Sequence, residues 1–150
     1  MKTISFLALV MLSLSMDGCC SNEQRVEPAY PQSVSGWKER REQGVRIHGD
    51  FVLKKGNSTD NGKIQVKIIG LIPPDLCAEA GAFQRQARAR IQFVRLADNE
   101  VLLDDLFAAK GSMTLSPANG ADLYEEFGIS VIYIYDINLK DGWVHFELRG

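Results

Sequence analysis

The chain has 150 residues, of which 45% are hydrophobic and 24% are charged, and its formal net charge at pH 7 is −2. These values are typical of a soluble globular protein, and a domain of this length can bury a core without needing a metal or several disulfides. Because no basic excess is available to neutralise phosphates, we expect no nucleic-acid partner.

Residues 1–18 have the pattern of a signal peptide. Lys2 supplies a positive charge, Ile4 to Leu14 form an almost unbroken apolar run, and Asp17 with Gly18 ends that run. As a helix, the run would cross only about half of the hydrocarbon core of a membrane, so a cleaved signal is favoured over a transmembrane anchor. The sequence therefore predicts a protein that works outside the cytoplasm.

The end of this segment, from Met16 to Cys19, resembles the signal of bacterial lipoproteins, in which small residues precede a cysteine that is acylated and becomes the mature N-terminus. Gly18 and Cys19 fit that signal, whereas Asp17 stands where a small apolar residue is usual. The resemblance implies a lipid on Cys19 and an anchor in the cell envelope. The alternative is cleavage after Ser15, which would leave a soluble secreted or periplasmic protein.

Two cysteines remain if Cys19 carries a lipid. In an oxidising compartment Cys20 and Cys77 could form a disulfide that joins the N-terminal segment to the folded domain. The alternative for Cys77 is a buried thiol that packs as a small hydrophobic side chain. Residues 19–36 are polar, interrupted by prolines and without periodicity. They indicate a flexible tether before a folded domain at residues 37–150.

The domain begins with two alternating segments. Residues 45–54 and 63–69 both alternate apolar and polar side chains, and the turn-forming residues 56–62 separate them. This pattern predicts a hairpin of two strands, each with one buried and one exposed face.

Further strands follow at residues 87–96 and 101–103, with a short one near residues 113–115. The alternation changes parity near Phe93, which predicts a bulge there. Between the strands, residues 76–86 could hold one short helix and residues 123–126 a helical turn.

The C-terminal segment has the clearest hairpin pattern. Asp141-Gly142 is a favoured two-residue turn, and the register that it implies places Asn138 opposite His145 and Asp136 opposite Glu147. The inward side chains would then be Ile129, Val131, Tyr133, Tyr135, Ile137 and Leu139 on the first strand and Val144, Phe146 and Leu148 on the second.

About seven short strands separated by turns predict an all-β fold. We expect an antiparallel β-sandwich of immunoglobulin-like or transthyretin-like kind, with a small β-barrel as the alternative.

The outward residues of the C-terminal hairpin form the first candidate site. Asp136, Asn138, His145 and Glu147 would lie within cross-strand reach, where they could contact a ligand or a divalent cation. The alternative is a solvated sheet face in which neighbouring basic side chains relieve the acidic repulsion. No metal-site spacing of the His-x-x-x-His or Cys-x-x-Cys type is present. We therefore favour the solvated face and expect neither a metal nor a cofactor.

Two other polar groups could carry chemistry. His48 and Asp50 share the predicted outer face of their strand and could serve as a base and its orienting acid, but no nucleophile motif accompanies them. Arg85, Arg88 and Arg90 form the densest basic stretch, which we interpret as a solvated face rather than an anion site. We therefore expect no catalytic residue.

Large aromatic side chains are the remaining candidates. Tyr133 and Tyr135 lie in a strand that is apolar on both faces, and Trp37 and Trp143 are two further amphipathic side chains. Such residues can stack on sugars or dominate a protein interface, but they are more often part of a core.

Together these patterns predict an exported, lipid-anchored β-sandwich module that is not an enzyme and that contacts an envelope protein or an extracellular ligand. The alternative is a secreted carbohydrate-binding or metal-dependent protein or enzyme that uses the outer face of the C-terminal hairpin.

Overall fold

A computed structural model describes residues 36–150. The predicted signal peptide, Cys19, Cys20 and the tether up to residue 35 lie outside this part of the chain. The described residues form nine strands and one short helix: β1 (Gly36–Glu42), β2 (Val45–Lys54), β3 (Ser58–Asp60), β4 (Ile64–Ile72), β5 (Arg88–Arg95), β6 (Val101–Ala108), β7 (Ser112–Thr114), α1 (Ala121–Glu125), β8 (Val131–Asn138) and β9 (Trp143–Arg149).

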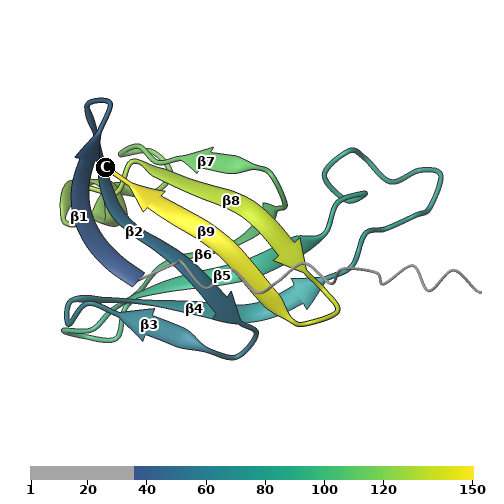
Figure 1. The fold of residues 1–150 in the computed structure, drawn as a ribbon, viewed down its shortest axis with the longest axis horizontal. Helices are drawn as coiled ribbons and strands as arrows, with labels where there is room; N and C mark the ends of the chain where they lie inside the picture. The colour runs from purple at the N-terminus through teal and green to yellow at the C-terminus, as the bar shows by residue number, and fades with distance from the viewer. Residues whose placement is uncertain (1–35) are drawn as a thin grey trace, which may run out of the picture. The chain divides into compact units, whose positions relative to one another are not determined.

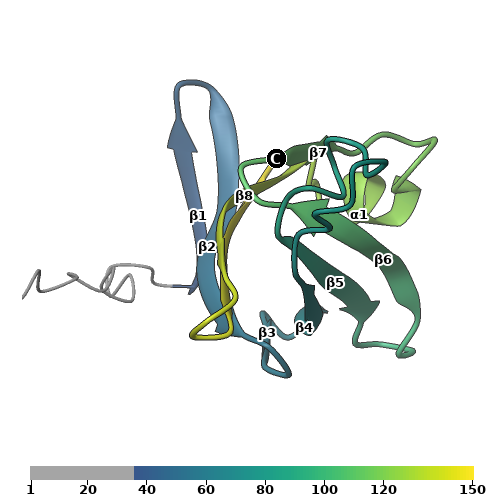
Figure 2. The same cartoon turned by 90° about the vertical axis from the view of Figure 1, so that its right-hand side faces the viewer.

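The strands form two antiparallel sheets that pack face to face. One has the strand order β1-β2-β9-β8-β7, and the other has the order β3-β4-β5-β6. Figure 1 shows the five-stranded sheet in front of the four-stranded one, and Figure 2 shows the two layers from the side. The predicted all-β sandwich is confirmed, and the sheets do not close into a barrel.

The first predicted hairpin is wrong. β2 pairs with β1 and β9, whereas β4 pairs with β3 and β5, so the chain changes sheets between Lys54 and Ser58. The turn at Gly56 has a φ of 83°, which suits glycine. Alternation shows which face of a strand is buried, but it does not show which strand lies beside it, and both sheets offer the same core to an apolar face.

Two segments without clear alternation differ from the sequence prediction. β1 is an edge strand of mostly charged residues, and its sequence did not predict a strand. Residues 76–86 form hydrogen-bonded turns rather than the expected short helix, and Pro73-Pro74 precede them. By contrast, α1 confirms the helical turn predicted near residues 123–126, and the shift in β5 pairing at Phe93 confirms the bulge.

The C-terminal hairpin exists, but its predicted register is wrong. Asn138 pairs with Trp143, so four residues rather than two connect β8 to β9. The Asn138 side chain accepts a hydrogen bond from the Asp141 amide at 2.8 Å, and its backbone carbonyl accepts one from Gly142 at 2.9 Å. These bonds stabilise a four-residue loop whose centre lies one residue before that of the predicted Asp-Gly turn. Every cross-strand pair therefore differs from the predicted one.

A bulge in β8 changes which side chains enter the core. The pairing with β9 shifts between Ile134 and Asp136, so that Tyr135 is an extra residue. Ile132, Ile134 and Ile137 are therefore buried, whereas Tyr133 and Tyr135 lie on the outer face, opposite to the prediction. On β9 the predicted inward residues are confirmed, because Val144, Phe146 and Leu148 are fully buried.

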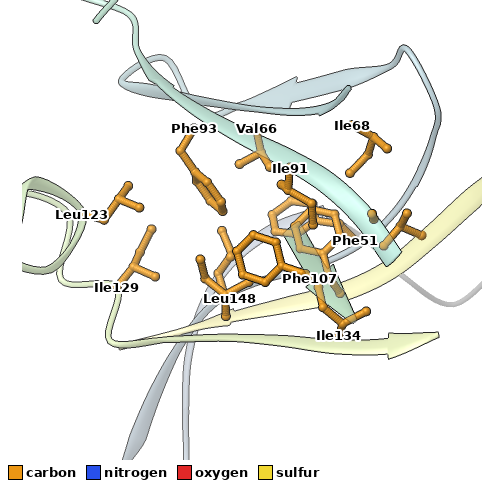
Figure 3. Close-up of a cluster of buried hydrophobic side chains, with 14 of the residues drawn as sticks. Phe51, Val66, Ile68, Ile91, Phe93, Phe107, Leu123, Ile129, Ile134 and Leu148 are labelled. Carbon is orange, nitrogen blue, oxygen red and sulfur yellow. The ribbon is translucent and has the colours of Figure 1, made fainter. Parts of the chain in front are cut away.

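The core lies between the sheets. Val66, Ile68, Ile91 and Phe93 from the four-stranded sheet point toward Phe51, Ile134 and Leu148 from the five-stranded sheet (Figure 3). Phe51 stacks on Phe146 with ring centroids 5.1 Å apart. Leu123 and Ile129, from α1 and the segment after it, close one end of the core (Figure 3). Each such side chain contributes about 1.5–3 kcal/mol when it leaves water, which fixes the two sheets against each other.

Within residues 36–150, no helix has the length and apolar character needed to cross a membrane.

Candidate functional site

The richest polar arrangement lies on the outer face of the five-stranded sheet, where β2, β9 and β8 run side by side (Figure 1). Because Val144, Phe146 and Leu148 face the core, the residues between them face outward. We use the name outer-face cluster for six side chains from these three strands: Asp50 of β2, Tyr133 and Tyr135 of β8, and His145, Glu147 and Arg149 of β9.

Glu147 is the centre of this cluster. It is only 2% exposed, and its Oε2 atom accepts a hydrogen bond from the Tyr135 hydroxyl at 2.5 Å. The Arg149 guanidinium donates to the same oxygen from Nε at 2.9 Å and from Nη2 at 2.6 Å. Arg149 Nη2 also donates to the Tyr135 oxygen at 3.1 Å. The buried carboxylate therefore has the charged and neutral donors that burial demands.

The electrostatics of the cluster follow from these contacts. Burial raises the pKa of Tyr135, and the hydrogen bond to Glu147 raises it further, so the phenol stays neutral at physiological pH. The Glu147 hydrogen bond raises the pKa of Arg149. Tyr135 and Arg149 thus keep fixed charges over the physiological range, and the network holds the tyrosine ring in one orientation.

The aromatic rings extend the network across the face. His145 Nε2 lies 2.9 Å from Asp50 Oδ1, and the imidazole lies against the Tyr135 ring with centroids 4.7 Å apart. Tyr133 meets Tyr135 edge to face at 4.8 Å, and the Arg149 guanidinium lies 5.7 Å from the Tyr133 ring centre. Tyr135 nevertheless keeps 36% of its surface exposed.

The structure brings together only part of the predicted candidate face. His145 and Glu147 belong to the outer-face cluster, but Asp136 is paired in register with His145 rather than with Glu147, and its Oδ1 accepts the Ile137 amide at 2.9 Å. Asn138 is engaged by Asp141 in the turn. Among the residues that the structure describes, no group of three or more His, Cys, Asp or Glu side chains could hold a metal ion.

His48 and Asp50 do not form the predicted pair. The pairing of β2 with β9 shifts between Ile47 and Gly49, and this irregularity separates the two side chains. His48 Nε2 lies 3.1 Å from the Gly128 carbonyl oxygen, whereas Asp50 contacts His145. Because a carbonyl only accepts, Nε2 of His48 carries the proton in this bond. Burial lowers the pKa of His48.

The basic stretch around β5 is occupied by local partners. Arg90 forms two bonds to Asp104 at 2.7 and 2.8 Å, and Arg85 donates to the Ala78 carbonyl. Arg88 lies over the Phe83 ring. Each of these arginines therefore has a nearby contact within the domain, as expected of a solvated structural face.

The other candidates are placed as follows. Trp143 is 3% exposed, and Trp37 packs against Phe51 at 4.9 Å while donating to Thr59. Cys77 is an exposed side chain in the loop between β4 and β5 rather than a buried one, and it forms no disulfide within residues 36–150. Its proposed partner Cys20 and the proposed lipid site Cys19 lie outside the described residues, so both remain predictions.

The sequence does not predict four members of the outer-face cluster in this arrangement. It pairs Asp50 with His48, it predicts that Tyr133 and Tyr135 point inward, and it gives no separate signal for Arg149. The pairing of β2 with β9 and the bulge at Tyr135 create the cluster. The sequence carries no local signal for that pairing, so the outer-face cluster could be recognised only once the pairing was known.

Comparisons of this chain with protein-family models, with curated proteins and with solved structures found no match.

Proposed function

We propose that this chain is an exported, lipid-anchored binding module, without enzymatic activity, that contacts a protein partner of the cell envelope through the outer-face cluster. The observation that carries the proposal is the pair Tyr133 and Tyr135 on an accessible sheet face, held in place by the Glu147 network. Tyrosine and arginine dominate the energetics of protein interfaces, and fixed rotamers reduce the entropy lost on binding.

The charges of the cluster favour contact over chemistry. Arg149 and the Tyr135 hydroxyl satisfy Glu147, and Asp50 occupies one nitrogen of His145. These groups form their hydrogen bonds with one another, and this arrangement makes the surface rigid. The apolar faces of the tyrosine rings remain as the contact area that a partner would bury.

Capture from envelope extract tests this proposal. The full chain serves as bait beside Tyr135→Ala and a matched control, Tyr124→Ala, since Tyr124 lies on α1 and is 43% exposed. We expect one specific protein to be recovered by the wild-type chain and by Tyr124→Ala, and its recovery to fall at least tenfold with Tyr135→Ala. Equal recovery by all three baits would reject the outer-face cluster as the binding surface.

A glycan is the second candidate partner, because adjacent tyrosine rings can also stack on sugars. Trp143 is too buried to be the main platform, so the test uses Tyr135→Ala on a glycan array. Binding to one glycan class that is lost in this variant and retained in Tyr124→Ala would replace the protein partner by a carbohydrate.

The proposed anchor has a separate test. Intact mass of the protein extracted from membranes should show a chain beginning at Cys19 with two or three acyl groups. A mature chain that begins near Met16 and carries no lipid would replace the anchored protein by a soluble exported one.

A further inference from the structure

A hollow of about 370 Å³ is lined by residues none of which belongs to the outer-face cluster. Its wall is formed by β1 and β2, by the start of β4, and by the segment from Glu125, the last residue of α1, to Ile129. Its volume lies in the range of small-molecule sites, which begins at roughly 300 Å³.

The hollow is lined by charged side chains, which we call its rim, and by hydrophobic ones. Trp37 and Phe127 are half-buried hydrophobic members of the lining, whereas Ile64 and Ile129 are each only 1% exposed. A site lined by both hydrophobic and charged side chains suits a ligand that has a hydrophobic part and charged ends. The charged ends need partners of opposite charge, because burying an unpaired charge is costly.

Two of the acidic groups on the rim already have partners. Glu39 and Arg46 form an ion pair at 2.6 Å across β1 and β2. Glu126 accepts two hydrogen bonds from Arg95, which also contacts Asp98 and Glu100. These pairs brace the wall from both sides and leave little charge for a ligand.

Two charged groups on the rim remain without an ion-pair partner among residues 36–150. Lys63 belongs to the turn before β4, and Glu125 is the last residue of α1. The Asn61 side chain fixes the turn by accepting hydrogen bonds from the Lys63 and Ile64 amides, each at 3.0 Å. Lys63 is therefore positioned by its backbone. Its ammonium group forms no ion pair within residues 36–150, but it adds to the larger effect of Arg46 in lowering the pKa of Glu39.

His48 adds a neutral group to this wall. Burial lowers the pKa of His48, and its Nε2–H group donates to the Gly128 carbonyl. The imidazole is consequently uncharged near neutral pH. The charges left for a ligand are one cation, Lys63, and one anion, Glu125.

We propose that this hollow binds a small zwitterion of the amino-acid class. Its carboxylate would pair with Lys63, its ammonium group with Glu125, and its side chain would pack against Trp37 and Phe127. This site is independent of the proposed partner surface, because it shares no residue with the outer-face cluster.

Calorimetric titration of the full chain with L-phenylalanine and L-leucine tests the proposal. We expect saturable binding, weakened at least tenfold by Lys63→Gln and by Glu125→Gln. The control variants Lys55→Gln and Glu79→Gln remove exposed charges outside the hollow and should bind as tightly as the wild-type chain.

Two modified ligands assign each charged end. N-acetyl-L-phenylalanine lacks the ammonium group and should bind weakly, with no further loss in Glu125→Gln. L-phenylalanine amide lacks the carboxylate and should bind weakly, with no further loss in Lys63→Gln. Tyr135→Ala should bind the amino acids normally, which separates this test from that of the partner surface. Absence of saturable binding by both amino acids, or an affinity unchanged in Lys63→Gln and Glu125→Gln, would overturn the proposal.

Discussion

The outer faces of the two sheets carry ion pairs in different surroundings. On the five-stranded sheet the side chain of Glu147 is 3% exposed and is held by Arg149 and Tyr135 together. On the four-stranded sheet Asp104 is held by Arg90, whose side chain is 53% exposed. The first arrangement fixes the positions of aromatic rings, whereas the second is open to water and salt. Burial of the carboxylate, rather than the presence of an ion pair, distinguishes the candidate site.

The largest difference is expected when each carboxylate is removed. Glu147→Ala leaves Arg149 and the Tyr135 hydroxyl without their acceptor and opens a small void, which should cost about 2–3 kcal/mol of unfolding free energy. Asp104→Ala should cost clearly less, because water replaces its contacts. Urea unfolding of both variants makes the comparison. An equal loss in the two would show that the buried network has no special weight.

A smaller effect is expected from a single hydroxyl. Tyr135→Phe removes the 2.5 Å hydrogen bond to Glu147 and should cost about 1 kcal/mol. Tyr133→Phe is the matched control, since the contacts of Tyr133 in the cluster are made by its ring. Thermal unfolding should separate the two variants. Indistinguishable melting temperatures would indicate that the Tyr135 hydroxyl does not support the network.

His48 on β2 allows a comparison of stability at different pH values. Burial lowers the pKa of His48 in the folded state below the ordinary histidine value of 6.5, so the unfolded chain binds more protons between the two values. The stabilising contribution is complete above the unfolded pKa and is lost as pH falls through the folded pKa. Unfolding of the wild-type chain should therefore lose stability below about pH 6.5 more steeply than that of His48→Gln. Parallel profiles would contradict this role of His48.

The smallest effect is expected on the exposed face. Arg90→Gln removes one side of the Arg90–Asp104 pair, and its urea midpoint should match that of the wild-type chain at high salt. A clear loss that persists at high salt would place this pair in the same class as the Glu147 network.

Local patterns predicted much of the fold. The alternation of β9 identified Val144, Phe146 and Leu148 as core, and the parity change in β5 identified a bulge, because each depends on neighbouring residues only. The partner of β2 depends on residues about a hundred positions away, and the sequence offers no local signal for that pairing.

The candidate site depends on strand irregularities, which are hard to predict from the sequence. A single extra residue at Tyr135 reverses the faces of half a strand, and the irregularity near His48 separates that histidine from Asp50. Neither irregularity is visible in the amino-acid composition of its strand. The sequence predicts that His145 and Glu147 are neighbours on an outer face, but their observed partners, Asp50 and Tyr135, depend on the tertiary pairing of the strands.

The central claim is that the outer-face cluster contacts a protein partner, and site-specific photo-crosslinking tests it most directly. A photoreactive phenylalanine analogue at position 135 in the intact host cell should give one covalent adduct of defined mass. The same analogue at position 124, on α1, should give none. An adduct at position 124 alone, or equal labelling at the two positions, would contradict the claim.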